Sequence, residues 1–167
     1  LGACSGLLVA GSEMGEIIAE HLLAAGLGQL VVTARVPARA DILARRLGCH
    51  CEPFEILHGL LGAADIVITA VGSGGHLIGG DMVADALALR RQKPIFLIDA
   101  AVPGDIHPAV NDLDGAFMYD IGDLESVAME SGMTAKDTIA DLAADHLAPR
   151  LEAARRAVLA ETPDADA

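Results

Sequence analysis

Short apolar segments rich in Val, Ile and Leu alternate along the chain with longer segments in which apolar residues recur at helical spacing. Short runs of this kind predict buried strands, and the longer periodic segments predict amphipathic helices. The predicted strands cover residues 6–10, 29–34, 49–53, 65–71, 94–100 and 115–120. This pattern places a helical segment between most successive strands.

Glycine and proline mark the ends of the predicted helices. The first helix stops at Gly26 and carries on one face Met14, Ile17, Ile18, Leu22 and Ala25. The second begins at Pro37, whose fixed φ suits the first helical position, and ends before Gly48. A short helix is predicted over residues 54–62, and a longer one over residues 82–93 with Asp81 as its capping residue.

The alternation of strands and helices predicts an α/β fold, a doubly wound parallel sheet of the Rossmann-like type, followed by a long C-terminal helix. Right-handed crossovers place every loop that follows a strand at one edge of such a sheet, and ligands bind at that edge. The loops concerned are residues 10–15, 34–39, 71–76 and 100–108. Candidate binding residues are therefore expected in these loops.

The pattern changes toward the C-terminus, where a single apolar stripe continues along one long helix. Thr134 is expected to cap this helix, and Pro149 to kink it because proline lacks an amide donor. The chain is thus divided into a domain of residues 1–132, a connecting helix of residues 133–160 and a disordered tail of residues 161–167. For the helix, a connecting arm, a partner-binding role and packing back on the sheet all remain open.

Charge and composition exclude several classes of function. The 167 residues carry a formal net charge of −13, so the chain is not expected to bind nucleic acid by itself. No apolar run approaches the roughly 18 residues needed to span a membrane, and no basic segment suggests a signal peptide. We expect a cytoplasmic protein without a membrane partner, and a piece of a longer protein because the first residue is Leu1.

The three cysteines, Cys4, Cys49 and Cys51, do not indicate a disulfide framework, because their number is odd in a chain of intracellular composition. Residues 49–51 read Cys-His-Cys, which is a possible start of a metal site. A second cluster of ligands is missing, and strand geometry directs His50 to the face opposite its neighbours. The sequence therefore predicts a half-buried strand and no metal site.

The loop after the first strand resembles a dinucleotide fingerprint, Gly-x-Gly-x-x-Gly, whose third glycine permits close packing of helix on strand. Gly15 occupies that third position, whereas Ala10 and Ser12 occupy the first two. The Ser12 side chain crowds the expected pyrophosphate, but its hydroxyl and the free amides of the helix start can donate hydrogen bonds. The candidate cofactor-binding residues of this loop are Ala10, Gly11, Ser12, Glu13, Met14 and Gly15.

The end of the second strand indicates which cofactor is used. NAD sites place Asp or Glu there to hold the ribose 2′-hydroxyl, whereas NADP sites place an arginine near the 2′-phosphate. This chain has Thr33, Arg35 and Arg39 in that stretch, and no acidic residue before Asp41. Because a guanidinium binds phosphate through charge-assisted hydrogen bonds, the predicted cofactor is NADP.

Several segments together resemble the central NADP-binding domain of the glutamyl-tRNA reductase family. The family's Glu-Met-Gly is matched by Glu13, Met14 and Gly15, and its Thr-Gly-Ser becomes Val71, Gly72 and Ser73. Its Asp-x-Ala-Val-Pro-Arg-Asp-Ile-x-Pro segment is matched at residues 99–108, with Gly104 in place of the arginine. A Tyr-Asp-x-x-Asp-Leu segment is intact at residues 119–124. Of the Asn-Arg-Thr turn that follows the second strand, only Arg35 is matched.

The resemblance implies an enzyme that reduces glutamyl-tRNA to glutamate-1-semialdehyde with NADPH, at the start of tetrapyrrole (porphyrin) biosynthesis. It implies that Val71, Gly72 and Ser73 join the first two loops in binding NADP. It also implies a homodimer in which a separate N-terminal domain supplies the catalytic cysteine and a spinal helix joins the domains. Because that domain is not in this sequence, we predict no catalytic residue here and no reduction of glutamyl-tRNA by this chain alone.

Two alternatives remain. Another oxidoreductase of the shikimate dehydrogenase-like group would need a catalytic Lys–Asp pair, for which Lys93 and Lys136 are poorly placed. A degenerate Rossmann module without cofactor, acting in assembly through its long helix, would explain the missing glycines of the first loop. Gly15 and Arg35 argue against that module.

Overall fold

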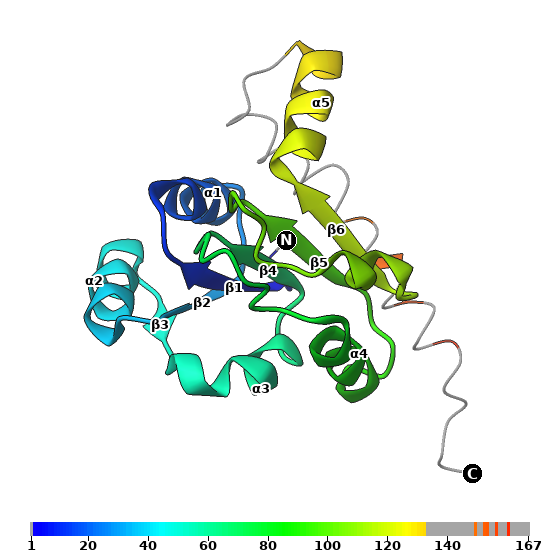
Figure 1. The fold of residues 1–167 in the computed structure, drawn as a ribbon, viewed down its shortest axis with the longest axis horizontal. Coiled ribbons are helices and arrows are strands. Elements are labelled where there is room, and N and C mark those ends of the chain that lie inside the picture. Colours follow the sequence, from blue (N-terminus) through cyan, green and yellow to red (C-terminus); the bar gives the residue numbers. More distant parts are fainter. Residues whose placement is uncertain (1, 133–148, 150–151, 154–155, 157–159, 161–167) are drawn as a thin grey trace.

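The computed structural model contains a parallel sheet of six strands (Figure 1). The structure describes residues 2–132, together with residues 149, 152–153, 156 and 160. The strands are β1 (Ser5–Ala10), β2 (Gln29–Ala34), β3 (His50–Cys51), β4 (Ile66–Thr69), β5 (Ile95–Asp99) and β6 (Ala116–Asp120). They lie in the order β3-β2-β1-β4-β5-β6, and every neighbouring pair is parallel. The predicted fold class is confirmed, and each predicted strand is present within a few residues of its expected bounds.

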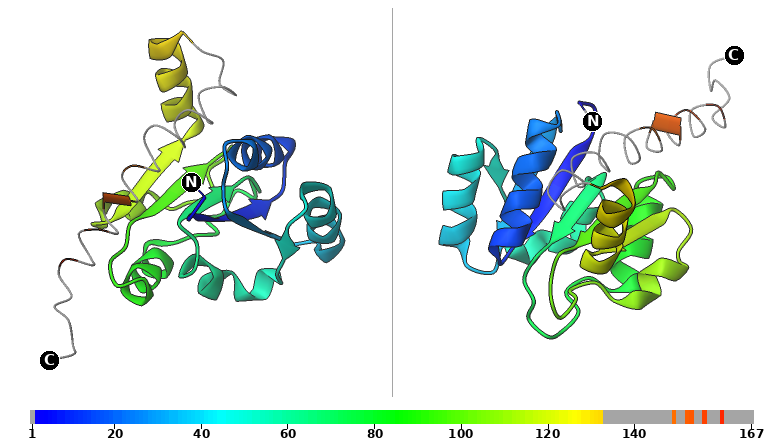
Figure 2. Two further views of the ribbon diagram at one scale, coloured as in Figure 1. Left: turned by 180° about the vertical axis from the view of Figure 1, so that it is seen from behind. Right: turned by 90° about the horizontal axis from the view of Figure 1, so that it is seen from above.

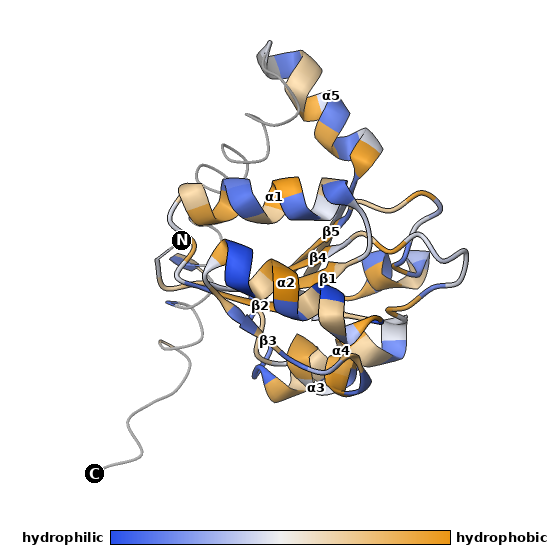
Figure 3. Cartoon of the chain, turned by 90° about the vertical axis from the view of Figure 1, so that its left-hand side faces the viewer, coloured by the Kyte–Doolittle hydropathy of each residue, from blue (hydrophilic) through white to orange (hydrophobic). Residues whose placement is uncertain are grey.

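Helices cover both faces of this sheet, as the two views of Figure 2 show. They are α1 (Glu13–Ala24), α2 (Pro37–Leu47), α3 (Leu57–Leu61), α4 (Gly80–Leu89) and α5 (Ile121–Ser131), with short 3-10 helices η1 (Phe54–Ile56) and η2 (Pro108–Asp112). Helices α1 and α2 lie side by side on one face (Figure 3), and α3 and α4 pack on the other. Helix α5 begins at the carboxyl end of β6.

The buried side chains form one cluster on each face of the sheet. The first cluster joins strand residues to α1, α2 and α5 and includes Leu8, Ile18, Leu22, Leu43, Ile68, Phe96 and Leu124. The second joins the opposite strand faces to α3 and α4 and includes Leu7, Val9, Leu57, Leu61, Val67, Val83 and Leu97. Successive residues of β1 thus alternate between the two clusters, because neighbouring side chains of a strand point to opposite faces.

The predicted ends of the second helix are confirmed, whereas those of the helix near residue 82 are wrong. Helix α2 starts at Pro37 and ends before Gly48, which has a left-handed φ of +67°. Helix α4 is capped by Gly79, so Asp81 lies inside its first turn instead of capping it. The helix ends at Leu89, because Arg91 and Gln92 adopt left-handed φ values of +53° and +62° that a right-handed helix cannot contain. The Arg90 guanidinium folds back onto the carbonyl oxygens of Lys93 and Pro94.

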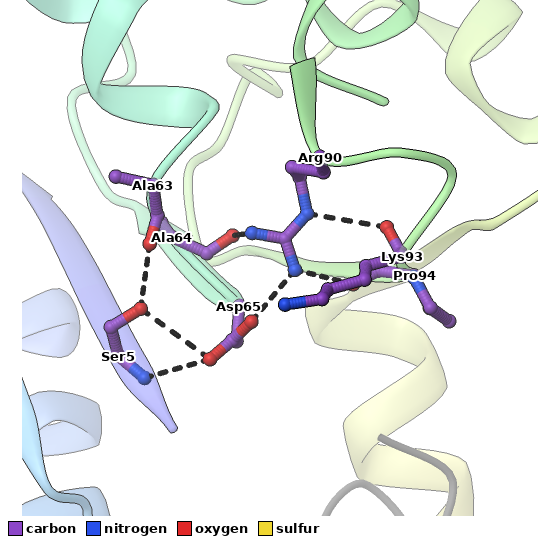
Figure 4. Close-up of polar contacts among 7 residues, drawn as sticks. All are labelled: Ser5, Ala63, Ala64, Asp65, Arg90, Lys93 and Pro94. Atoms are coloured by element: carbon purple, nitrogen blue, oxygen red, sulfur yellow. Dashed lines mark hydrogen bonds and ion pairs between the residues drawn. The ribbon is translucent and has the colours of Figure 1, made fainter. Parts of the chain in front are cut away.

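A buried ion pair joins three elements at the amino edge of the sheet (Figure 4). Asp65, which precedes β4, pairs with Arg90 at the end of α4, with 2.7 Å between Oδ1 and Nη2. The other carboxylate oxygen accepts a hydrogen bond from the Ser5 amide at the start of β1, at 3.0 Å. The guanidinium also donates to the carbonyl oxygens of Ala64, Lys93 and Pro94. Both charged side chains are almost fully buried, and each one is extensively hydrogen-bonded.

The predicted C-terminal helix and tail are covered by the structure only in part. Most of the predicted connecting helix of residues 133–160, and the whole predicted tail of residues 161–167, lie outside the described residues. The division of the chain at residue 132 therefore stays a prediction. Within the described part of the chain, none of the helices has the length and apolar character needed to cross a bilayer.

Candidate functional site

The loops that follow β1 and β4 meet at the carboxyl edge of the sheet. Strand β1 is hydrogen-bonded to β2 on one side and to β4 on the other. The chain leaves β1 for α1 on one face and leaves β4 for α4 on the opposite face. Ligands of doubly wound sheets bind where successive connections diverge in this way. The candidate site is therefore the edge where residues 10–15 and 71–73 come together.

Gly11 is the point of closest approach between these two loops. A Cβ atom at this position would lie 2.5 Å from the Cα of Val71 and 2.6 Å from the carbonyl oxygen of Ala70. Both are backbone atoms, so no side chain fits there without moving the loop. The fingerprint alignment assigns the tight positions to Ala10 and Ser12, whereas the structure makes Gly11 the constrained residue. Ala10 is instead buried in the first core cluster.

Gly15 lets helix α1 pack directly on the strands beneath it. A Cβ atom at this position would lie 2.6 Å from the Cβ of Ala70 and 3.1 Å from a methyl carbon of Leu8. This is the packing that the third glycine of the fingerprint permits. The start of α1 is thereby held close to the carboxyl ends of β1 and β4.

The amides at the start of α1 have no side-chain cap. Ser12 is the N-cap residue, with φ of −134° and ψ of 165°, but its side chain makes no capping hydrogen bond. Helix α5 differs, because its cap residue Asp120 accepts a hydrogen bond from the Asp123 amide and the Asp123 side chain accepts one in return. The free amides and positive dipole end of α1 therefore remain available to an anion, whereas the capping box of α5 already bonds the amides of Asp120 and Asp123. Glu13 and Met14 are exposed in the same first turn of α1.

A buried carboxylate fixes the position of the loop after β4. Asp105 accepts hydrogen bonds from the Val71 amide at 2.7 Å and from the Gly72 amide at 2.9 Å, one on each carboxylate oxygen. Gly72 has a left-handed φ of +69°, and a Cβ atom there would lie 3.3 Å from the carbonyl oxygen of Val102. The loop after β5 therefore supports the loop that carries Val71, Gly72 and Ser73.

A second buried carboxylate organises the loop after β5 itself. Asp99 ends β5 and accepts hydrogen bonds from the amides of Ala101 (3.1 Å), Asp105 (3.2 Å) and Ile106 (3.0 Å). A Cβ atom at Gly104 would lie 2.9 Å from Oδ2 of Asp99. The segment that carries the most specific part of the family resemblance is thus a turn folded around one carboxylate, with glycine packed against it.

Arg35 lies just beyond the end of β2 with its charge unpaired. Its side chain is exposed, and its guanidinium carbon lies 5.8 Å from the centre of the Phe54 ring. Among the described residues, no hydrogen-bond or ion-pair partner of this guanidinium is found. Arg39 differs, because its Nη2 is 3.1 Å from Oε1 of Glu16 on α1. Of the two arginines predicted to hold a 2′-phosphate, Arg35 is therefore the one whose charge is available.

The remaining predicted residues have different surroundings. Thr33 is completely buried in β2, and its hydroxyl has no hydrogen-bond partner within the described chain. Ala10 is also buried, so the side chains of Thr33 and Ala10 are not accessible to a ligand. Ser73 is exposed and donates a hydrogen bond to the carbonyl oxygen of Gly75 at 3.1 Å. The binding roles of these residues stay predictions.

Sequence reasoning missed Phe54, Asp99 and Asp105 as residues that shape this edge. Asp99 and Asp105 belong to the segment that carries the resemblance, and this is the signal that could have identified them. Phe54 has no such signal, because its relation to Arg35 follows only from the pairing of β2 with β3.

The thiols of the two cysteines near β3 have raised pKa values. Burial, with a smaller contribution from Cys51, raises the pKa of the Cys49 thiol. The hydrogen bond to Asp41 is the main cause that raises the pKa of the Cys51 thiol. His50 is exposed between these two half-buried cysteines, as a short strand requires. In the part of the chain that the structure describes, no group of three or more His, Cys, Asp or Glu side chains could hold a metal ion.

Comparison with known families identifies one match over most of the described chain. The model of the family described as Shikimate / quinate 5-dehydrogenase matches residues 3–127. Among curated proteins, the glutamyl-tRNA reductase of Rhodospirillum rubrum is 45% identical over 137 residues, which cover 82% of this chain and 32% of that protein. That of Bacillus subtilis is 38% identical over 121 residues, which cover 72% of this chain and 27% of that protein. The chain thus spans about a third of the length of the relatives it matches.

Two solved structures have the same arrangement of strands and helices. The glutamyl-tRNA reductase of Methanopyrus kandleri superposes with a TM-score of 0.75 at 27% identity, covering 95% of this chain and 40% of that one. The nucleotide binding domain of the glutamyl-tRNA reductase of Thermoplasma volcanium superposes with a TM-score of 0.59 at 13% identity. The match covers 78% of this chain and 85% of that domain, and at this identity it shows the fold alone.

Proposed function

This chain belongs to the Shikimate / quinate 5-dehydrogenase family, and we propose that it is the NADP(H)-binding domain of a glutamyl-tRNA reductase. The observation that carries the proposal is the position of Arg35, an unpaired guanidinium at the ligand edge of a dinucleotide-binding fold. The similarity to glutamyl-tRNA reductases over most of this chain supports the choice of enzyme.

The residues at the carboxyl edge fit the parts of a dinucleotide. The uncapped amides at the start of α1 suit the pyrophosphate, and Gly11 and Gly15 allow the backbone of that loop to lie close to the sheet. Arg35 suits a 2′-phosphate, because a guanidinium forms paired hydrogen bonds with phosphate oxygens. The loop held by Asp105 would lie beside the nicotinamide half of the cofactor.

In the whole enzyme, this domain would orient NADPH, which supplies the hydride that reduces glutamyl-tRNA to glutamate-1-semialdehyde in tetrapyrrole biosynthesis. The acyl group of the substrate must be held against the cofactor by other parts of a protein about three times as long. We propose that the full protein is a cytoplasmic homodimer, that its substrate tRNA binds outside this chain, and that this chain alone does not reduce glutamyl-tRNA.

Cofactor titration of this chain tests the proposal. NADPH is expected to bind more tightly than NADH, and Arg35→Ala is expected to remove most of that difference, because it deletes the cation that meets the 2′-phosphate. Arg45→Ala is the matched control, since Arg45 is an exposed arginine in the last turn of α2. Equal affinities for NADPH and NADH in the unchanged protein would contradict the NADP assignment.

The two alternative functions make different predictions in the same titration. A module that has lost its cofactor would bind neither nucleotide, and Ser12 at the start of α1 is the feature that favours it. A Lys–Asp catalytic pair of the shikimate dehydrogenase kind receives no support from Lys93, which follows Arg90 at the amino edge, opposite the candidate site (Figure 4). Lys136 lies outside the described residues.

A further inference from the structure

The pairing of β2 with β3 brings an aromatic ring to the end of β2. The two strands are parallel, with Val31 opposite His50 and Val32 opposite Cys51. The Glu52 amide continues this ladder by donating to the carbonyl oxygen of Val32 at 3.0 Å. Arg35 directly follows β2, and Phe54 begins η1 three residues after β3. The pairing of the two strands therefore brings the segments that carry Arg35 and Phe54 close together.

The Phe54 ring packs against the hydrophobic core. Phe54 is half-buried and packs against the second core cluster, as does Val31 of β2. Arg35 follows the last residue of β2 and lies above this ring. The ring thus has one side supported by the core and presents another to the guanidinium, 5.8 Å from its centre.

A guanidinium held against a ring keeps its binding capacity. Its N–H donors point outward in the plane of the group, and a cation–π contact uses none of them as a hydrogen bond, so they stay free to bind phosphate oxygens. An arginine side chain otherwise samples many rotamers, and holding it in one orientation lowers the entropic cost of binding. Arg39 shows the contrasting case, because its guanidinium is held by the carboxylate of Glu16, which competes with any phosphate.

We propose that Phe54 is a positioning residue for NADP specificity: its ring holds the Arg35 guanidinium where the 2′-phosphate of the cofactor binds. This inference rests on the proposed function and adds to it a residue from a different element, η1. Phe54 contacts Arg35, which would bind only the 2′-phosphate, the group that NADPH has and NADH lacks. It therefore affects the preference for NADPH over NADH, and leaves the affinity for NADH unchanged.

The test compares dissociation constants of NADPH and NADH for Phe54→Leu, Phe54→Tyr and the unchanged 167-residue chain. An exposed cation–π contact of about 0.5–1 kcal/mol corresponds to a roughly two- to fivefold change in binding. Phe54→Leu keeps an apolar side chain for the core but removes the ring, so NADPH is expected to weaken by that factor while NADH is unaffected. Phe54→Tyr keeps the ring and is expected to retain the preference. The matched control is Phe117→Leu, which removes an aromatic ring stacked on Phe96 at the distant edge of the sheet.

A double-mutant cycle separates this inference from the proposed function. In an Arg35→Ala background, Phe54→Leu is expected to have no further effect on NADPH, because the guanidinium that the ring holds is gone. Equal weakening of NADPH and NADH by Phe54→Leu would overturn the positioning role and indicate a general structural one. An NADPH preference that depends on Arg35 but not on Phe54 would overturn this inference alone. Absence of any NADPH binding by the unchanged chain would overturn both proposals.

Discussion

The two edges of the sheet bury carboxylates in opposite ways. At the amino edge, Asp65 is paired with the guanidinium of Arg90, and both are almost fully buried. At the carboxyl edge, the hydrogen bonds of Asp99 and Asp105 within the described chain come from backbone amides and from the Thr69 hydroxyl. The amino edge is thus a closed structural contact, whereas the carboxylates of the other edge shape the loops of the candidate site.

This difference leaves the arginines of the two edges with different roles. Arg90 makes four hydrogen bonds, to Asp65 and to three carbonyl oxygens, so its guanidinium is held within the amino edge. Arg35, at the carboxyl edge, faces no carboxylate among the described residues and contacts the Phe54 ring instead. Asp99 and Asp105 are bonded to amides and Glu16 to Arg39, so Arg35 remains available for an anionic ligand.

The largest expected effect is the loss of the amino-edge contact. Arg90→Ala removes the buried guanidinium that pairs with Asp65, and breaking a buried ion pair costs about 3–5 kcal/mol of unfolding free energy. Urea denaturation of the variant measures this loss. Arg45→Ala, at an exposed position, is expected to change stability by no more than about 0.5 kcal/mol. A loss below about 1 kcal/mol for Arg90→Ala would show that the ion pair contributes little to the stability of this edge.

An intermediate effect is expected from Asp105→Asn at the opposite edge. An amide side chain offers one acceptor oxygen and would turn its NH2 group toward the second backbone donor, at a cost of roughly 1.5–3 kcal/mol. Because Asp105 holds the loop of residues 71–73, NADPH affinity is also expected to fall. Asp112→Asn, in the exposed part of η2, is the matched control. If Asp105→Asn and Arg90→Ala changed stability and NADPH affinity alike, the functional distinction between the edges would be wrong.

The smallest effect concerns the two helix starts. Asp120→Ala removes the capping box of α5 and is expected to cost about 1 kcal/mol of unfolding free energy. Ser12→Ala removes a side chain that makes no capping hydrogen bond, so its cost is expected to stay below about 0.5 kcal/mol. Thermal unfolding of the two variants in parallel gives the comparison. A larger loss for Ser12→Ala than for Asp120→Ala would mean that Ser12 caps α1 in solution.

Local patterns predicted the elements of this fold, because each depends on neighbouring residues. The alternation of apolar strands and periodic helices predicted the parallel sheet, and Pro37 and Gly48 marked the ends of α2. The end of α4 was not predictable in this way. The segment after Leu89 continues a helical composition, but Arg91 and Gln92 adopt left-handed φ values, and Arg90 bonds to Asp65, which lies 25 residues earlier in the chain.

The candidate site was predictable only as a set of loops. The position of Gly15 and the availability of arginine near the end of β2 follow from known spacings in dinucleotide-binding folds. The tight contact of Gly11 with Val71 and the support of Val71 by Asp105 join residues far apart in the sequence. Spacing within one loop carries no information on such contacts, so the roles of Gly11 and Asp105 required the three-dimensional structure.

The pairing of β1 with β4 also bears on how the protein is made. Ser5 and Asp65, which meet at the amino edge, are separated by 60 residues. During synthesis, β1 and β2 leave the ribosome well before β4, and in that interval one side of β1 exposes unpaired backbone donors and acceptors beside apolar side chains. An open edge of this kind can recruit strands of other nascent chains. Pairing of β4 with β1 covers these backbone groups. Once Arg90 has been synthesised, it can pair with Asp65, whose other carboxylate oxygen accepts a hydrogen bond from the Ser5 amide.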